Sequence, residues 1–156
     1  MGTTEADDET ISTHDALSGK KQIGIFFSAR WCGPCRHFTP QLVEEYKKLK
    51  SQGFEIVFAS SDKERSVCKG YFDDMGDWLT LPYDNRDLKS KLSEKYKVQR
   101  IPKLVILDNK GELVTTEGRL LVGNNKPFPY HGGTYRACAK TYLRYKSIAN
   151  PVSYEP

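Results

Sequence analysis

The order of apolar segments in this chain predicts a three-layer α/β/α sandwich around a central mixed β-sheet. Short runs rich in β-branched and aromatic residues, at 23–27, 54–59 and 103–107, alternate with segments whose apolar residues recur at helical spacing. Strands that alternate with helices favour parallel pairing at the centre of a sheet. The turn sequence at 108–111 predicts a hairpin to 112–116, which adds an antiparallel edge and makes the sheet mixed.

The first strand is predicted directly after the polar turn at 18–21, and a helix is predicted over 35–50. Five apolar residues of this helix have the spacing of one buried face: Phe38, Leu42, Val43, Tyr46 and Leu49. Pro40 lies inside it and is expected to kink the helix or to remove one hydrogen bond. Gly53 ends the helix, and the second strand follows at 54–59.

Two further helices are predicted in the second half of the chain. Apolar residues recur at helical spacing over 67–75 and again over 88–96, and a loop is expected between them at 77–84. Trp78 in this loop is expected to pack in the core or against the loop itself. The strand at 103–107 then leads into the hairpin.

Length and composition limit the classes of function. The 156 residues make one domain, and 38% hydrophobic with 28% charged residues suits a globular protein rather than a disordered one. No apolar run approaches the roughly 18 residues that span a bilayer, so no membrane partner is expected. The net charge of +4 comes from basic residues interleaved with acidic ones, whereas a strong nucleic-acid binder shows a clustered stripe. No nucleic-acid partner is therefore expected.

Charge also divides the chain into three expected parts. Residues 1–19 contain five acidic residues and no lysine or arginine, which predicts a flexible acidic leader. Residues 20–130 form the predicted folded domain, and residues 131–156 form a basic tail with four basic residues against one acidic residue. Four tail residues approximate one helical stripe: Tyr135, Cys138, Tyr142 and Tyr145. The tail is expected to dock as a last helix, with a disordered basic-aromatic arm as the alternative.

Cysteine usage bears on the compartment. Four cysteines in 156 residues are too few for a disulfide scaffold, and the sequence opens without an apolar or Arg-rich targeting stretch. We therefore expect a reducing compartment, the cytoplasm and also the nucleus, in which cysteines remain thiols unless they cycle.

The segment 31–35, Trp-Cys-Gly-Pro-Cys, lies between the first strand and the first helix. Two cysteines separated by two residues can close a small disulfide ring, and a helix N-terminus favours the thiolate. Cys32 occupies that N-terminal position, whereas Cys35 lies one turn further in and is expected to be more buried. We therefore expect Cys32 to attack a substrate disulfide and Cys35 to resolve the mixed disulfide.

A zinc site is the alternative use of the same two cysteines. Structural zinc requires four ligands, commonly as two close pairs. His37 follows Cys35 by only two residues, and Cys68 and Cys138 stand alone in the sequence. The position of the pair after a buried strand and before a helix favours redox chemistry, so no metal is expected.

Pro102 directly precedes the strand at 103–107 and has two readings. A proline in that place is often only a strand boundary. The functional reading is a cis Ile101–Pro102 bond facing the cysteines, and the order of the redox motif and this proline along the chain favours it.

The chain resembles the thioredoxin superfamily and, within it, the tryparedoxin and nucleoredoxin branch. The most specific flanks of the redox motif are Phe-Ser-Ala-Arg-Trp-Cys at 27–32 and Cys-Arg-His-Phe-Thr-Pro at 35–40. The resemblance covers about residues 20–130 and has further matches at 58–62, 78–79, 81–83, 101–102, 105–108 and 128–130.

The resemblance implies a thioredoxin fold and the reduction of protein disulfides by dithiol–disulfide exchange in the cytosol or nucleus. It implies that Cys32 is the nucleophile, that Cys35 is the resolving thiol, and that Pro102 is the cis proline of a loop that binds the substrate backbone. The substrate-binding set expected from it is Trp31, Gly33, Pro34, Arg36, Ile101 and Pro102. No cofactor is expected beyond the redox-active disulfide. An external low-molecular-weight dithiol or a reductase would supply electrons, and the chain would act as a monomer on disulfide-containing proteins.

This chain departs from the pattern at three places. Gly33-Pro34 stands where the branch usually has Pro-Pro, which alters the N–H groups that face the Cys32 sulfur. Phe26 stands where thioredoxins place a buried acid, so proton transfer from Cys35 must use another group or water. Lys103 follows the cis proline where the family often has Thr, and a cation there is expected to favour the Cys32 thiolate and acidic partners.

Other polar residues have plainer readings. Arg36 is either a site residue or a solvated helix residue, Arg30 is expected at the rim of the site, and His37 on the helix surface. Cys68 is expected to be a small buried hydrophobe rather than a regulatory thiol. Three acidic residues are expected on solvated faces: Glu64, Asp73 and Asp74.

Two functions compete for the site. The first is catalysis of thiol–disulfide exchange, and the second is a redox-sensitive binding adaptor of nucleoredoxin type with little turnover. The intact Cys-Gly-Pro-Cys favours catalysis, because a pure adaptor has no need of a resolving thiol. A peroxidase is not expected, since Ser28 and Ala29 do not supply the Thr that usually precedes its attacking cysteine.

Overall fold

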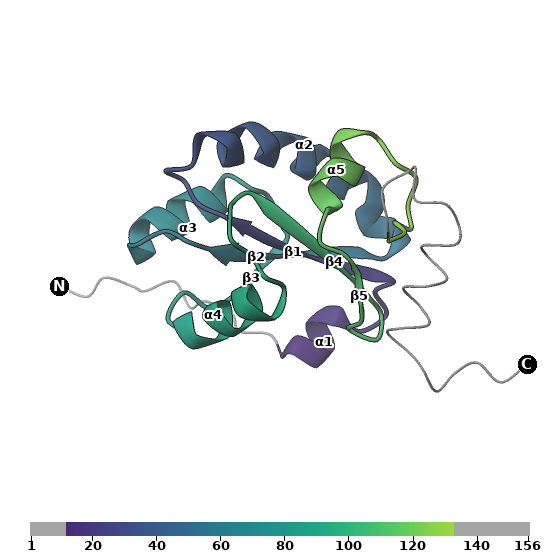
Figure 1. The fold of residues 1–156 in the computed structure, drawn as a ribbon, viewed down its shortest axis with the longest axis horizontal. Helices are drawn as coiled ribbons and strands as arrows, with labels where there is room; N and C mark the ends of the chain where they lie inside the picture. The colour runs from purple at the N-terminus through teal and green to yellow at the C-terminus, as the bar shows by residue number, and fades with distance from the viewer. Residues whose placement is uncertain (1–11, 133–156) are drawn as a thin grey trace, which may run out of the picture.

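The computed structural model describes residues 12–132 and has the expected three layers (Figure 1). A five-stranded sheet has the order β3-β2-β1-β4-β5. The strands are β1 (Gln22–Ser28), β2 (Phe54–Ser60), β3 (Leu79–Thr80), β4 (Lys103–Asp108) and β5 (Leu113–Thr115). The helices are α1 (Thr13–Leu17), α2 (Gly33–Leu49), α3 (Arg65–Asp73), α4 (Arg86–Lys95) and α5 (Gly118–Gly123), with a 3-10 turn η1 (Lys50–Gln52) after α2.

The sheet is mixed, and its antiparallel part begins nearer the centre than expected. β1 pairs in parallel with β2 but antiparallel with β4, and β5 then pairs antiparallel with β4. The sequence predicted the antiparallel pairing only at the hairpin edge. Because α4 returns the chain to the edge where β1 ends, β4 starts there, with Lys103 opposite Phe27. The residues before β4 are thereby placed beside the residues that follow β1.

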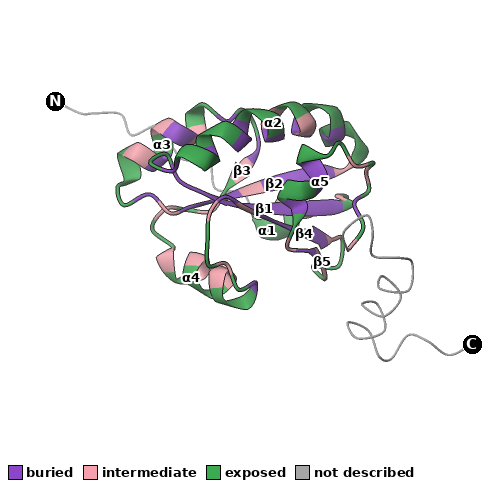
Figure 2. Cartoon of the chain, turned by 45° about the horizontal axis from the view of Figure 1, so that its top comes forward, coloured by how far each residue is buried: buried purple, intermediate pink, exposed green. Residues whose placement is uncertain are grey.

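Helices cover both faces of the sheet (Figures 1 and 2). Residues of α2, α3 and α5 pack on one face in the larger core cluster, and α4 contributes Leu92 to the cluster on the other face. Phe26 is fully buried in the larger cluster, where its ring lies 5.8 Å from that of Phe38 and 6.1 Å from that of Trp78. Each such edge-to-face pair adds about 0.5–1.5 kcal/mol beyond the area that it buries.

The long helix α2 runs through Pro40 to Leu49, as the spacing of its apolar residues predicts. A proline has no N–H, so the carbonyl of Arg36 loses its donor within the helix. The neighbouring Thr39 hydroxyl donates to the carbonyl of Cys35 at 2.9 Å, one turn earlier. The helix is nevertheless continuous from Gly33 to Leu49.

Three elements were missed by the sequence prediction. The expected flexible leader contains α1, in which the Ser12 hydroxyl accepts from the Asp15 N–H, and the expected loop at 77–84 contains the short strand β3. Helix α5 has only six residues and a glycine at each end. Its Gly118 lies so close to β4 that an added Cβ would meet the Leu104 carbonyl oxygen at 2.8 Å. Short elements of this kind form through tertiary contact rather than through local periodicity.

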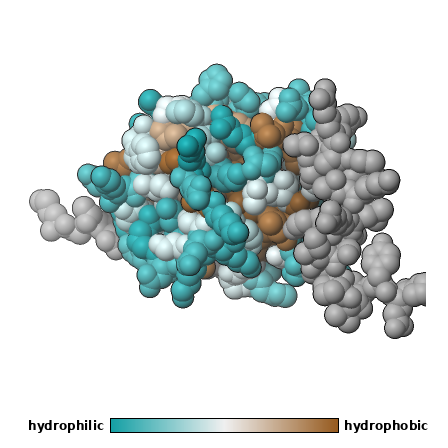
Figure 3. Space-filling view, viewed as in Figure 1, coloured by the Kyte–Doolittle hydropathy of each residue, from teal (hydrophilic) through white to brown (hydrophobic). Residues whose placement is uncertain are grey.

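The described part of the chain ends short of both termini. The leader before residue 12 and the tail after residue 132, including Cys138 and the predicted last helix, lie outside the described residues. None of the helices within 12–132 is long and apolar enough to cross a bilayer. Hydrophilic side chains cover most of the described surface in Figure 3, with smaller hydrophobic areas between them.

Two buried tyrosines tie distant segments together through carboxylates. The Tyr46 hydroxyl donates to Glu55 at 2.9 Å, and the Tyr130 hydroxyl donates to Glu45 at 3.0 Å. Burial raises the pKa of both hydroxyls, and the adjacent carboxylate raises each further. The backbone of Tyr130 also exchanges two hydrogen bonds of 2.8 Å with the Gln22 side chain, which holds this segment against β1.

We predict that stability falls as the pH rises above about 10, the ordinary pKa of tyrosine. Above that pH the unfolded chain loses phenolic protons that the folded chain still holds, so the unfolded state binds fewer protons and the free energy of unfolding decreases. Urea unfolding at pH 9 and pH 11 should show a smaller decrease for Tyr130→Phe than for the unmodified chain. Tyr83→Phe is the control, because its hydroxyl donates to a backbone carbonyl, that of Asp62. Equal decreases in both variants would contradict the assignment.

Candidate active site

The two cysteines of the redox motif lie at the connection between the end of β1 and the start of α2. Cys32 is the N-cap of α2, and it is joined to Cys35 in a disulfide with a Cα–Cα distance of 5.2 Å. Cys35 is fully buried, whereas Cys32 retains 7% of its surface. The predicted difference in burial is therefore confirmed. Gly33 and Pro34 are exposed above the disulfide, and Trp31 beside it is 64% exposed.

Helix α2 directs its positive end at the Cys32 sulfur. The Cys35 N–H donates to Cys32 Sγ at 3.3 Å, and the Arg36 N–H donates to the Cys32 carbonyl at 3.1 Å. The Cys35 N–H is one of the N–H groups that a helix leaves unpaired at its start, whereas the Arg36 N–H makes the first hydrogen bond within the helix. Gly33 keeps an N–H that a proline in its place would lack. Together with the dipole of a 17-residue helix, this arrangement favours negative charge on Cys32.

The segment before β4 forms the other wall of the site. The Ile101–Pro102 bond is cis, as the functional reading of the sequence predicted. The Ile101 carbonyl oxygen lies 3.8 Å from Cys32 Sγ, and the Ile101 side chain packs on the cluster of Ala29, Cys32 and Cys35. The antiparallel pairing of β4 with β1 brings these residues together across 69 positions of sequence.

Asp62 supports the loop that carries the disulfide, and sequence reasoning gave it no role. Its buried carboxylate accepts the Arg30 N–H at 2.9 Å and the Ser60 hydroxyl at 2.9 Å. Residues 29–31 are therefore tied to the end of β2, next to β1. The only sequence signal for this contact was that Asp62 lies two residues after the end of the buried strand β2.

Hydroxyl groups lie behind Cys35. Phe26 occupies the position of the thioredoxin acid, and it is enclosed by aromatic rings. The Thr39 hydroxyl donates its single hydrogen to the Cys35 carbonyl. Thr39 can therefore only accept from the Tyr71 hydroxyl, whose oxygen lies 2.7 Å away. Ser28 then donates to Tyr71, at 3.2 Å. This buried chain of hydroxyls ends at the backbone of Cys35.

The remaining candidate residues lie on the surface or in the core. Arg30, Arg36 and His37 are exposed, and Trp78 is buried in the core. The three acids expected on solvated faces are exposed: Glu64, Asp73 and Asp74. Cys68 is buried as a free thiol, and burial raises its pKa. Within residues 12–132, no three His, Cys, Asp or Glu side chains are grouped as a metal site would require.

We predict that Asp62→Ala weakens the hold on the disulfide loop. The change leaves the part-buried Arg30 N–H and the buried Ser60 hydroxyl without this acceptor, which should lower the free energy of unfolding by about 1–3 kcal/mol. Amide hydrogen exchange at residues 30–32 should also accelerate. Asp74→Ala, at an exposed acid, is the matched control. The same small change in both variants would contradict a supporting role for Asp62.

Comparison with known proteins agrees with this geometry. The profile of a family described as thioredoxin-like matches residues 19–113. Nucleoredoxin of Mus musculus is 44% identical over 114 residues, which cover 70% of this chain and 26% of that protein. The chain thus spans about a quarter of the length of the curated nucleoredoxins that it matches.

Solved structures give the same relationship over most of their length. Tryparedoxin I from Leishmania major is 42% identical and has a TM-score of 0.71, with 76% of this chain and 85% of that chain covered. Tryparedoxin II complexed with glutathionylspermidine is 35% identical and has a TM-score of 0.69, with 76% of this chain and 84% of that chain covered. The chain therefore belongs to the thioredoxin superfamily of redox enzymes, in the branch that contains nucleoredoxin and tryparedoxin.

Proposed function

We propose that this protein reduces disulfides in other proteins, with Cys32 as the attacking thiol and Cys35 as the resolving thiol. The observation that carries the proposal is the asymmetry of the pair. The sulfur of Cys32 receives the Cys35 N–H at the start of α2 and retains some exposure, whereas Cys35 is fully buried behind it. A thiolate is the reactive form in disulfide exchange, so the thiol at the helix start attacks first.

The first step forms a mixed disulfide. The Cys32 thiolate attacks one sulfur of the substrate disulfide, a new S–S bond joins Cys32 to the substrate, and the other substrate sulfur leaves as a thiolate. That thiolate takes up a proton from solvent. The opening above Gly33 and Pro34 leaves room for this approach, since both residues are exposed.

The second step releases the substrate. Cys35 loses its proton and attacks Cys32 Sγ, so that the Cys32–Cys35 disulfide forms and the second substrate sulfur leaves as a thiolate. Two electrons have then passed from the dithiol to the substrate, and two protons have passed to the two product thiols through solvent. With Phe26 in place of an acid, the Cys35 proton has no carboxylate acceptor at that position and must leave through another group or water.

The substrate backbone is proposed to lie between the disulfide and the cis-proline segment. The Ile101 carbonyl oxygen faces Cys32 at 3.8 Å from its sulfur, and the following Pro102 has no N–H to donate. A bound substrate is proposed to touch the residues around the disulfide, of which the first four are exposed, Ile101 is half-buried and Pro102 is buried. The proposed contact set is Trp31, Gly33, Pro34, Arg36, Ile101 and Pro102.

An external low-molecular-weight dithiol is proposed to return the Cys32–Cys35 disulfide to the dithiol by the reverse exchange, in which the two thiols of the donor become a disulfide. Tryparedoxin II has been solved with glutathionylspermidine, which supports a small thiol compound as the source of electrons, and a reductase is the other candidate. We propose no cofactor beyond the disulfide, and we place the monomeric protein in the cytoplasm and also the nucleus. The whole length of a nucleoredoxin exceeds this chain, so its partners enter only as proposals.

A redox-sensitive adaptor is the second candidate function, and one observation favours it. Trp31 is 64% exposed beside the disulfide, a large apolar surface suited to a partner. In this function the oxidation state of the cysteines would set binding, and turnover would be incidental.

We predict that the chain catalyses reduction of insulin by dithiothreitol, and that Cys32→Ser abolishes the catalysed rate. Cys35→Ser should lose turnover but accumulate a mixed disulfide with the substrate, because attack still occurs and resolution does not. Turbidity measures the rate, and mass spectrometry under non-reducing conditions detects the trapped species. Cys68→Ser is the control, as a change of a thiol outside the site.

The two functions predict different results in this assay. Absence of catalysed reduction in the unmodified chain, together with partner complexes that persist in both cysteine variants, would contradict the reductase and favour the adaptor. Trapping by Cys32→Ser rather than by Cys35→Ser would reverse the assigned roles.

A further inference from the structure

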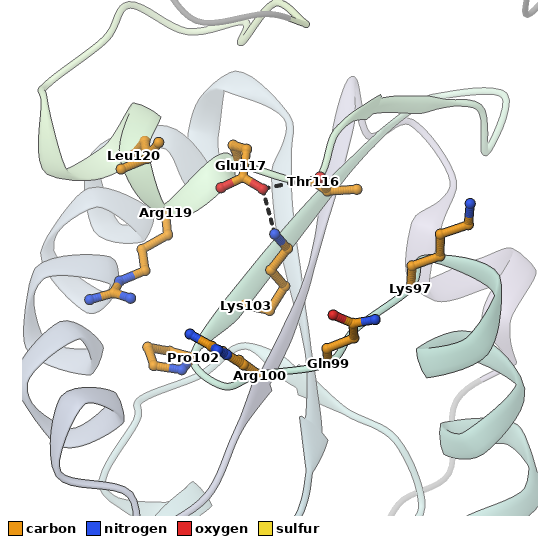
Figure 4. Close-up of a pocket in the computed structure, with 9 residues that line it drawn as sticks. All are labelled: Lys97, Gln99, Arg100, Pro102, Lys103, Thr116, Glu117, Arg119 and Leu120. Atoms are coloured by element: carbon orange, nitrogen blue, oxygen red, sulfur yellow. Dashed lines mark hydrogen bonds and ion pairs between the residues drawn. The ribbon is translucent and has the colours of Figure 1, made fainter.

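A groove opens on the side of the cis-proline segment that faces α5 and the end of β5 (Figure 4). Its volume is about 300 Å³, and Pro102 is part of its wall. Four basic side chains line it against a single acidic one. They are Lys97, Arg100, Lys103 and Arg119, with Glu117 as the acid.

The basic charge in this groove is largely uncompensated. Lys103 Nζ lies 2.5 Å from Glu117 Oε1, and among the described residues it is the one cation of the four that forms an ion pair. Lys97 and Arg100 are exposed, and the Arg119 guanidinium lies 5.7 Å from the centre of the Phe38 ring. Basic side chains gathered along one groove produce a positive potential that attracts a ligand with opposite charge.

The cis-proline segment links the groove to the reacting sulfur, because Pro102 lines the groove and its neighbour Ile101 contacts Cys32. Arg100 and Lys103 flank the Ile101–Pro102 bond on either side, and the Ile101 carbonyl oxygen lies 3.8 Å from Cys32 Sγ. A polypeptide whose sulfur is joined to Cys32 would pass this segment within one or two residues of its own cysteine. Side chains next to that cysteine would then reach the basic groove.

We propose that this groove binds carboxylate side chains that neighbour the target cysteine, and therefore selects acidic polypeptides as disulfide substrates. The proposal rests on the reductase function above and names its substrate class. Carboxylates match the donors available, since Arg100 and Arg119 offer forked N–H pairs and the two lysines offer point charges. Charge of this kind acts mainly on the rate of association and on the choice of partner.

Glu117 acts as an internal competitor in this groove. Its carboxylate forms an ion pair with Lys103 in the absence of substrate. Because the Glu117 side chain is 52% exposed, it can turn to solvent when a substrate carboxylate replaces it. Removing the Glu117 charge should therefore strengthen selection for acidic substrates, whereas removing a groove cation should weaken it.

Three disulfide peptides test the proposal. They are identical except for two positions beside the cysteine, which carry Asp, Asn or Lys, and each cysteine is joined to 2-mercaptoethanol as a neutral leaving thiol. Dithiothreitol returns the chain to the dithiol after each cycle, and rates are corrected for the reaction without the chain. At low ionic strength we expect kcat/KM for the Asp peptide to exceed that for the Asn peptide about tenfold, and the Lys peptide to be slowest. At 0.5 M salt the difference should shrink to about twofold, because screening shortens the range of the charges.

Variants assign the effect to the groove. Arg100→Gln should lower the Asp-to-Asn ratio of kcat/KM several-fold, and Glu117→Gln should raise it. Lys110→Gln is the matched control, because Lys110 is exposed at the β4–β5 turn, at the opposite end of β4 from Pro102. The control should leave the ratio unchanged.

The outcomes separate this inference from the function on which it rests. Equal kcat/KM for the three peptides with clear turnover of the Asn peptide would overturn the acidic-substrate groove and leave the reductase standing. A ratio that changes as much in Lys110→Gln as in Arg100→Gln would also overturn it. No turnover of any peptide would overturn the reductase itself, and the groove proposal with it.

Discussion

The antiparallel pairing of β4 with β1 is the constraint on which the site depends. Because Lys103 lies opposite Phe27, the start of β4 and the end of β1 share one edge of the sheet. The start of α2 and the segment before β4 therefore meet there, which sets the Ile101 carbonyl beside the Cys32 sulfur. Had β4 run parallel to β1, the cis-proline segment would lie at the far edge of the sheet. The packing of α2, α3 and α5 on one face and α4 on the other holds this arrangement in place.

Sequence reasoning reached the parts of the fold that are locally encoded. The strands at 23–27 and 54–59, the long helix through Pro40 and the redox motif at its start all carry their own periodicity or spacing. It missed α1, β3 and α5, which are too short for a period to be read and owe their form to neighbours. The direction of β4 was only partly anticipated, because strand order and direction depend on crossings that no local pattern records.

The sequence likewise predicted some residues of the site and missed others. Cys32 and Cys35 follow from spacing, and the cis state of Pro102 followed from the order of the motifs. The contact of Asp62 with the Arg30 N–H joins residues 32 positions apart, and an acid shortly after a buried strand is too weak a signal to predict it. The basic groove also assembles from several segments. Lys103 alone suggested acidic partners in the sequence, and the structure adds neighbouring cations and the carboxylate of Glu117 that competes for it.

We propose that the start of α2 makes Cys32 the reactive thiolate. The pKa of Cys32 can be measured from thiolate absorbance near 240 nm during a pH titration of the reduced Cys35→Ser variant, with Cys32→Ser/Cys35→Ser subtracted as background. We expect a midpoint clearly below about 8.5, the ordinary value for a cysteine, because the N–H groups and dipole of α2 stabilise the anion. A midpoint at or above that value would show that the helix start does not activate Cys32.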